Sequence, residues 1–232
     1  KKLKFFFPYL NFYFYSYGRT AFYVLLKELR KQTNKNKIII NSFTLFEMIN
    51  TIIYAGFEPI LIDLKQDSFQ SSFTEAIKKN KKNLAAIVVT HFNGFNDDIL
   101  KVKEIVSKEN EEILIIEDTA VGFGSKNKEI YSGNYGDYSI LSFNIMKNIT
   151  TLSGGALIEN NNKIIIDKNQ VYIRNQTPFN IFKKIIFVST LIIINLRLIF
   201  FLFFKFIKFS KMINFNFFLK KYRKDFKLSI KD

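Results

Sequence analysis

The stretch from Ile113 to Leu157 constrains the fold more than any other part of this sequence. It begins with an apolar run, Ile113 to Ile116, that has the composition of a buried strand and is followed by Asp118. A second strand pattern covers Tyr138 to Phe143 and is followed by Lys147. Because the carboxylate and the amine each follow a strand, the stretch predicts that they meet at one edge of a sheet.

Apolar strand patterns alternate with amphipathic helix patterns along the first 180 residues. The other expected strands are Ile38 to Asn41, Pro59 to Leu64, Ala85 to Thr90 and Ala156 to Glu159. The expected helices are Arg19 to Arg30, Thr44 to Tyr54 with Gly56 as its C-cap, Ser71 to Asn80, and Asp97 to Lys108. Phe5 to Tyr17, by contrast, is aromatic, irregular and broken by Pro8. The alternation indicates an α/β fold in three layers, with a mostly parallel sheet covered on both faces.

Three candidate functional segments follow strands of this predicted sheet. They are His91, Asp118 and the loop from Ser142 to Lys147. Ligands of such sheets bind beyond the carboxyl ends of the strands, so we expect these segments to form one site. Glu117 should point to the opposite face from Asp118, because side chains alternate along a strand. Asp137 is expected to be structural and to orient the loop before its strand.

The pair of Asp118 and Lys147 fits the chemistry of pyridoxal phosphate. A lysine amine can bind the aldehyde of this cofactor covalently, and a carboxylate can pair with the pyridine nitrogen and keep it protonated. The protonated ring then withdraws electrons from the reacting carbon. The alternatives are a solvated surface lysine and an aspartate that only caps a helix.

Gly18 opens the first predicted helix. A glycine turn at a helix start presents backbone N–H groups and the positive end of the helix dipole, which together favour phosphate binding. An ordinary helix start is the alternative.

Eight short motifs, in this order between about Tyr15 and Asn175, resemble the DegT/StrS-type nucleotide-sugar aminotransferases, which have the fold type I architecture. The motifs are Gly18-Arg19-Thr20-Ala21, Ser42-Phe43-Thr44, Tyr54-Ala55-Gly56, His91-Phe92-Asn93-Gly94, Glu117-Asp118-Thr119-Ala120, Gly136-Asp137, Ser142-Phe143 with Lys147, and Gly154-Gly155.

The resemblance implies a role for each candidate residue. Lys147 would be catalytic and Asp118 would hold the pyridinium nitrogen of pyridoxal phosphate. The phosphate would be bound by Ser142 and by the backbone of Gly18, Arg19 and Thr20. His91 would approach the cofactor or substrate, with a purely structural histidine as the alternative. The implied reaction is a ping-pong transamination of a keto group on a nucleotide-linked sugar for surface glycan synthesis. Its amino donor would be glutamate, and the enzyme would be a homodimer with sites at the subunit interface.

The sequence departs from the family pattern at three places. Val121 replaces a glutamine, and Leu45 replaces an aromatic residue that stacks on the ring, with Phe43 and Phe46 as possible substitutes. A counterpart of the family's smaller C-terminal domain is not recognisable. We therefore keep two alternatives: a sugar dehydratase, which Lys147 disfavours because the dehydratases have histidine there, and an inactive, membrane-associated binding or scaffold relative.

The segment 181–232 differs in character from the preceding 180 residues. It carries 12 Lys/Arg and 2 Asp/Glu, whereas the formal net charge of the whole chain is +15. Ile185 to Phe204 is mostly apolar but contains Arg197, which would cost at least ~2.5 kcal/mol in the middle of a bilayer. We therefore expect apolar helices lying in the interface of an anionic membrane rather than crossing it, with packing against a partner subunit as the alternative. The protein is accordingly expected in the cytoplasm, on the inner face of the membrane.

Composition excludes several other functions. The sequence has no cysteine and one histidine, which excludes disulfides and thiolate metal sites and argues against any metal site. The basic tail is too apolar to suggest nucleic acid. Because the chain begins with Lys1 and no signal peptide is recognisable, we expect it to be a fragment at its N-terminus.

Overall fold

The computed structural model describes residues 3–7, 11–66, 68, 70–92, 94–109, 112–167, 177–194, 196–197, 199–202 and 205. The chain forms two compact units, Lys1–Ile173 and Arg174–Asp232. The elements of the first unit are α1 (Leu3–Phe6), β1 (Asn11–Tyr15), α2 (Gly18–Gln32), β2 (Lys37–Asn41), α3 (Phe46–Tyr54), β3 (Glu58–Ile62), α4 (Phe73–Asn80), β4 (Leu84–Thr90), α5 (Ile99–Glu109), β5 (Leu114–Asp118), β6 (Lys126–Asn127), β7 (Ile130–Tyr131), β8 (Tyr138–Ser142) and β9 (Gly155–Glu159).

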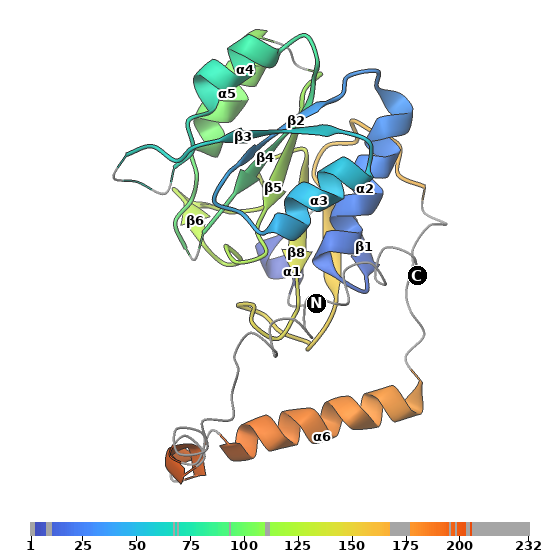
Figure 1. The fold of residues 1–232 in the computed structure, drawn as a ribbon, viewed down its shortest axis with the longest axis vertical. Coiled ribbons are helices and arrows are strands. Elements are labelled where there is room, and N and C mark those ends of the chain that lie inside the picture. Colours follow the sequence, from blue (N-terminus) through green and yellow to red (C-terminus); the bar gives the residue numbers. More distant parts are fainter. Residues whose placement is uncertain are drawn as a thin grey trace. The chain divides into compact units, whose positions relative to one another are not determined.

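The first unit is built on a seven-stranded sheet in the order β1-β9-β8-β5-β4-β2-β3, shown in Figure 1. The five strands from β3 to β8 pair in parallel, whereas β9 pairs antiparallel with both β8 and β1. The predicted mostly parallel sheet is therefore confirmed.

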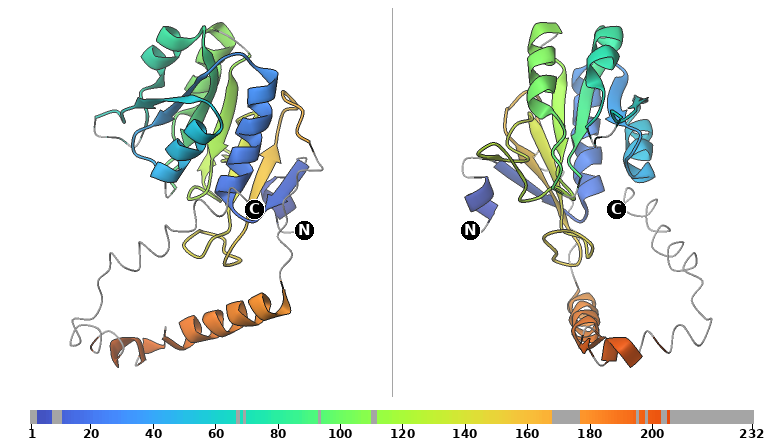
Figure 2. Two further views of the ribbon diagram at one scale, coloured as in Figure 1. Left: turned by 45° about the vertical axis from the view of Figure 1, so that its right-hand side comes forward. Right: turned by 90° about the vertical axis from the view of Figure 1, so that its left-hand side faces the viewer.

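Helices cover both faces of the sheet, as the views in Figure 2 show. One core cluster joins apolar side chains of α2 and α3 to alternate residues of the strands, such as Ile38, Ile116 and Ile140. A second cluster joins α4 and α5 to the residues in between, such as Ile39 and Ile115. The central strands β4 and β5 are buried along their whole length. This burial explains their unbroken apolar sequence and confirms the three-layer prediction.

The interpretation of the N-terminal segment as irregular was wrong. Asn11–Tyr15 forms β1, which pairs antiparallel with β9 at the edge of the sheet. Its inner side chains, Tyr13 and Tyr15, are buried, whereas Phe14 is largely exposed. The alternation was therefore present, but aromatic residues occupied both faces and concealed it.

The second unit contains α6 (Pro178–Ile194), an apolar helix that begins three residues before the predicted tail 181–232. Within the part of the chain that the structure describes, no helix is both long enough and apolar enough to cross a membrane. The prediction of further apolar helices is not supported, and residues 206–232 lie outside the described residues. The domain boundary after residue 180 stays a prediction.

Candidate active site

The carboxyl ends of β4, β5 and β8 lie side by side and bring the predicted site residues together. Thr90 pairs with Asp118, and Asp118 pairs with Ile140, two residues before Ser142. Thr90, Asp118 and Ser142 continue the strand positions whose side chains pack against α2 and α3. They therefore share one face of the sheet, at one edge.

Asp118 is the buried carboxylate of this edge. Its side chain Oδ1 accepts a hydrogen bond of 3.0 Å from the Ala120 N–H, and no described residue donates to Oδ2. Burial raises the pKa of the Asp118 carboxyl above its ordinary value, while the Ala120 N–H and the positive charge of Lys147 act in the opposite direction. An isolated carboxylate held out of water is suited to pairing with a cation.

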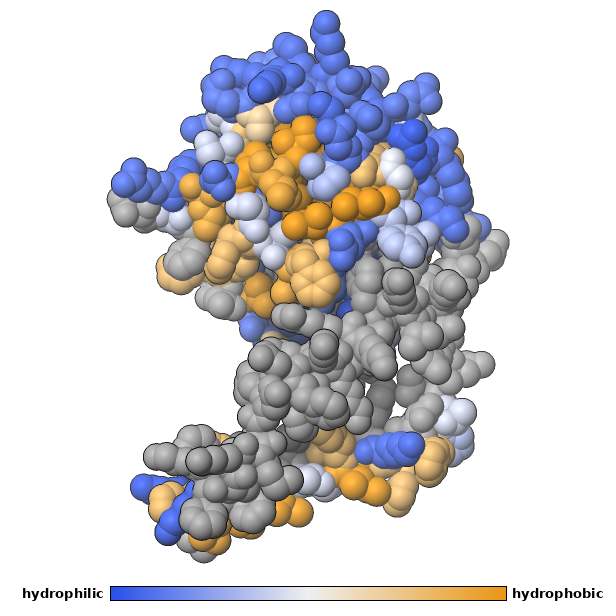
Figure 3. All heavy atoms as spheres, viewed as in Figure 1, coloured by the Kyte–Doolittle hydropathy of each residue, from blue (hydrophilic) through white to orange (hydrophobic). Residues whose placement is uncertain are grey.

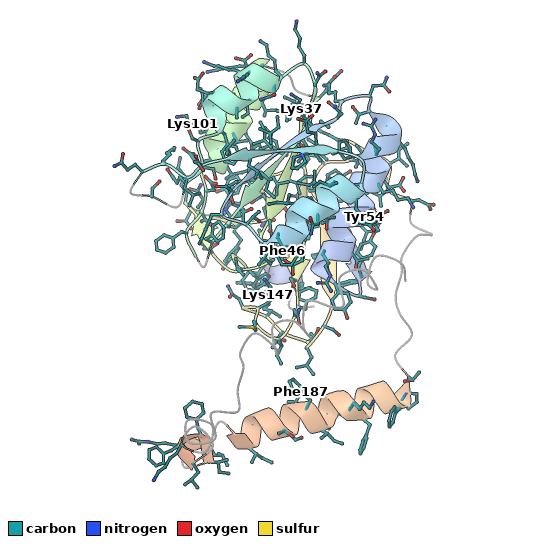
Figure 4. The ribbon with its side chains drawn as sticks, in the orientation of Figure 1. Lys37, Phe46, Tyr54, Lys101, Lys147 and Phe187 are labelled. Atoms are coloured by element: carbon teal, nitrogen blue, oxygen red, sulfur yellow. The ribbon has the colours of Figure 1, made fainter. Side chains whose placement is uncertain are left out.

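Lys147 lies in the loop that follows β8, at the edge of the sheet where β8 ends (Figure 4). Its backbone N–H donates to the Asn144 carbonyl at 3.1 Å, which closes a turn. At the base of the loop, the Phe143 N–H donates to the Gly154 carbonyl. The side chain is partly buried, and its charge is close enough to influence Asp118. The charges of the predicted lysine and carboxylate therefore interact, and their role in one site stays a prediction.

The start of α2 lies against the end of β8. A side chain at Gly18 would come within 2.9 Å of the Leu141 carbonyl and 3.1 Å of the Ser142 Cβ. A side chain at Gly155 would come within 2.2 Å of the Gly18 nitrogen, so the strand and the helix can approach only because both residues are glycine. This approach brings the N-terminus of α2 beside Ser142, as a phosphate site requires.

The other two residues of the predicted phosphate site occupy the first turn of α2. Tyr17, the N-cap, makes no side-chain hydrogen bond to the helix. The Arg19 guanidinium lies over the Tyr17 ring, 4.8 Å from its centroid, and Thr20 is buried. The structure therefore places Gly18, Arg19, Thr20 and Ser142 close together, and their role in phosphate binding stays a prediction.

His91 is fully buried, and both of its ring nitrogens contact protein groups. The Asp97 N–H donates to Nδ1 at 3.2 Å, so Nε2 carries the hydrogen and donates to the Glu117 carboxylate at 2.9 Å. Both ring nitrogens of His91 therefore already make hydrogen bonds to protein groups, and the Glu117 side chain that one of them contacts lies on the opposite face of the sheet from Asp118. These contacts favour the structural alternative, and a cofactor contact through the ring face stays a prediction.

Glu117 was expected to point away from Asp118, and it does. Its carboxylate accepts hydrogen bonds from His91 and from the backbone N–H groups of Gly133, Tyr135 and Gly136. This carboxylate therefore fixes the loop before β8. Asp137 is structural as expected, because its Oδ2 accepts a hydrogen bond of 2.8 Å from the Ile115 N–H.

Two residues of this edge were missed from the sequence. Thr90 is buried, and its hydroxyl has no hydrogen-bond partner among the described residues. Asn148 donates from Nδ2 to the carbonyls of Val121 and Phe123. Position supplied a signal for Thr90, which ends a buried strand, but not for the contacts of Asn148.

The two departures from the family pattern lie close to this edge. Leu45 is the N-cap of α3 and is 61% exposed. Phe43 packs against Phe92 with ring centroids 5.1 Å apart, so an aromatic pair is present next to the departure.

Among the described residues, no group of histidine, aspartate and glutamate side chains could hold a metal ion.

Residues 15–177 match the model of the DegT/DnrJ/EryC1/StrS aminotransferase family. The chain belongs to this family. It is 33% identical over 133 residues to the GDP-perosamine synthase of Escherichia coli O157:H7, an alignment covering 57% of this chain and 36% of that protein. It is 31% identical over 134 residues to a UDP-4-amino-4,6-dideoxy-N-acetyl-beta-L-altrosamine transaminase of Campylobacter jejuni, covering 56% of this chain and 35% of that protein. The chain thus spans about a third of the length of the curated relatives that it matches.

Solved structures of sugar-modifying enzymes share the fold. PseC of Helicobacter pylori, an aminotransferase involved in the biosynthesis of pseudoaminic acid, superposes with a TM-score of 0.62 at 22% identity, covering 70% of this chain and 43% of PseC. The GDP-4-keto-6-deoxy-D-mannose-3-dehydratase of E. coli with bound hydrated PLP superposes with a TM-score of 0.61 at 17% identity, covering 69% of this chain and 42% of the dehydratase. Because these two enzymes catalyse different reactions, the fold alone does not select between them.

Proposed function

We propose that the protein to which this chain belongs is a pyridoxal-phosphate-dependent aminotransferase that acts on a keto group of a nucleotide-linked sugar. The observation that carries the proposal is the position of Lys147, whose positive charge lies close enough to act on the pKa of the buried Asp118 carboxyl. One oxygen of that carboxyl accepts no hydrogen bond from the described residues. Family membership and the names of the relatives support the sugar substrate. Lys147 also disfavours the dehydratase alternative.

The described residues fit this cofactor. The start of α2 and Ser142 would hold the phosphate, and Asp118 would pair with the protonated pyridine nitrogen. When bound, the cofactor supplies a ring that accepts electron density from the reacting carbon. The Lys147 amine would bind the cofactor aldehyde, release it to an amino donor, which we propose is glutamate, and carry a proton at the donor's α-carbon.

Absorption and mass spectrometry test the proposal without an activity assay. Protein mixed with pyridoxal phosphate should develop an absorption band near the visible edge, and borohydride should convert the bound cofactor into a permanent adduct on Lys147. Lys147→Ala should lose both the band and the adduct, whereas Lys101→Ala, at an exposed position of α5, should retain them. A folded wild-type protein that forms neither would refute the proposal.

We also propose that the enzyme is a homodimer. Apolar side chains gather over β3 and α3 on the face seen in Figure 3, and the exposed ones include Phe46, Ile53, Tyr54 and Leu61. A patch of this kind marks an interface between proteins. Sedimentation velocity should show a dimer that Ile53→Asp converts to a monomer, and a monomeric wild type would contradict the proposal.

The tail supports a proposal about location: attachment to the inner face of an anionic membrane in the cytoplasm, where surface glycans are synthesised. The exposed side chains of α6 include Phe179, Phe182 and Phe187, the last of which is labelled in Figure 4. Lysines accompany them in the surrounding sequence. The full chain should sediment with vesicles of phosphatidylglycerol and phosphatidylcholine more than with phosphatidylcholine alone, and Phe187→Asp should weaken this binding. Equal recovery with and without vesicles would refute the attachment.

The second candidate function is a membrane-associated scaffold that has kept the fold and lost the chemistry. Leu45 and Val121 favour it, because each replaces a residue that the family uses against the ring. The two candidates differ in one result: the scaffold would bind vesicles but form no adduct on Lys147.

A further inference from the structure

Two loops form the reactive part of the candidate site. One continues from Asp118 through Thr119 to Ser125, and the other runs from Phe143 to Gly154 and carries Lys147. The sheet fixes the base of each loop, but strand pairing between β5 and β8 reaches only Asp118 and Ile140. The position of the Lys147 amine relative to the carboxylate therefore depends on contacts between the loops.

Asn148 supplies such a contact. Its Nδ2 donates to the Val121 carbonyl at 3.2 Å and to the Phe123 carbonyl at 3.1 Å. Both hydrogens of one side-chain amide are thus used on the backbone of the opposite loop. Asn148 is the residue directly after Lys147. Its partner Val121 is the residue directly after Ala120, whose backbone N–H donates to the Asp118 carboxylate.

The tip of the lysine loop, which these hydrogen bonds of Asn148 hold, lies at the surface of the domain. Met146 is 86% exposed, and Asn148 itself is exposed, so the tip of the lysine loop is not buried in the core. Leu152 has a φ of 70°, which a non-glycine residue adopts only where the surrounding structure holds it. Substituting Asn148 should therefore release the tip of the loop without unfolding the sheet.

We propose that Asn148 is a positioning residue: it holds the loop that carries Lys147 against the loop that follows Asp118. This inference rests on the proposed aminotransferase function. Asn148 touches neither the cofactor nor the substrate in this proposal. It acts through the backbone that it shares with Lys147. Without it, the lysine amine would occupy a wider range of positions and meet the cofactor aldehyde less often in a reactive geometry.

Asn148→Asp is the sharpest test, because it preserves size and replaces the two N–H donors by an oxygen that faces two carbonyl oxygens. Asn148→Ala removes the amide, and Asn34→Ala is the matched control at an exposed asparagine in another loop. Each purified full-length variant is mixed with pyridoxal phosphate and quenched with borohydride at successive times. The Lys147 adduct is then measured by mass spectrometry.

Both Asn148 variants should form the adduct about tenfold more slowly than wild type, with the larger effect in Asn148→Asp. The pH midpoint of the absorption band of the lysine-bound cofactor should also shift, because the amine has lost its fixed distance to Asp118. The control should match wild type, and the circular dichroism of all variants should be unchanged.

Wild-type adduct rates and pH midpoints in Asn148→Asp would overturn the positioning role. So would loss of the folded signal in both variants, because Asn148 would then be needed for folding. A wild type that forms no adduct refutes the aminotransferase proposal itself, and the inference fails with it.

Discussion

Replacing Glu117 by glutamine should unfold this domain far more readily than its small chemical change suggests. The Glu117 carboxylate is fully buried and accepts hydrogen bonds from the His91 ring and three backbone N–H groups. Glutamine has the same shape, but one of its two terminal atoms is a donor and cannot accept. His91 cannot adapt by exchanging its hydrogen, because Nδ1 already accepts one from the Asp97 N–H.

The magnitude follows from this count of donors. At least two of the four would lose their acceptor and remain buried, at about 1–3 kcal/mol each. We therefore expect Glu117→Gln to lower the free energy of unfolding by about 4 kcal/mol. This is a large part of the roughly 5–15 kcal/mol that stabilises a typical domain.

Urea denaturation followed by circular dichroism measures this loss. Glu104→Gln is the control, because Glu104 is exposed and forms an ion pair with Lys108 one helical turn away. It should change stability by less than about 0.5 kcal/mol. A loss below about 1 kcal/mol in Glu117→Gln would show that this carboxylate does not hold the 133–136 loop in the way described.

Three further substitutions test other parts of the same edge. Asp118→Asn should stabilise the protein without cofactor at neutral pH while abolishing cofactor binding. Because burial raises the pKa of Asp118, the folded state binds the proton more tightly than the unfolded state. The contribution of Asp118 to the free energy of unfolding therefore falls as the pH rises above 3.8. Urea midpoints at several pH values should show this fall in wild type and not in the variant. Thr90→Val should raise the free energy of unfolding by about 1 kcal/mol, since it removes a buried hydroxyl that has no hydrogen-bond partner among the described residues; a decrease would mean that the hydroxyl is bonded. Gly155→Ala should destabilise the domain by at least ~1–3 kcal/mol, because its methyl group would meet the backbone of Gly18 at 2.2–2.4 Å, and wild-type stability would refute that packing.

The central strands could be predicted because they are buried on both faces. β4 and β5 are buried at every position, so their sequences are unbroken apolar runs. Gly56 was expected as the C-cap of α3, but the C-cap is Ala55. Gly56 follows it directly and has a φ of +84°, which favours glycine. β1 was missed because an edge strand rich in tyrosine and phenylalanine lacks the polar outer face that marks alternation.

The composition of the candidate site was predictable only in part. Asp118 and Ser142 are the last residues of β5 and β8, and Lys147 follows β8. Parallel strands bring their carboxyl ends together whatever the loops between them do. The ties between the loops were not predictable. The contact of Asn148 with Val121 joins a side chain to a backbone carbonyl, which any residue provides, so no pattern of side chains announces it.

Glu117 and Asp118 illustrate how one local sequence can serve both stability and chemistry. They are adjacent carboxylates at the end of one strand, and the alternation of β5 directs them to opposite faces. On one face, Glu117 is fully hydrogen-bonded and fixes the loop that leads into β8. On the other, Asp118 accepts one hydrogen bond among the described residues, from the Ala120 N–H, and burial raises the pKa of its carboxyl even though the charge of Lys147 acts to lower it. The buried charge that destabilises the empty domain is the feature that would favour a protonated ring, so binding and stability should respond in opposite directions to substitution at Asp118.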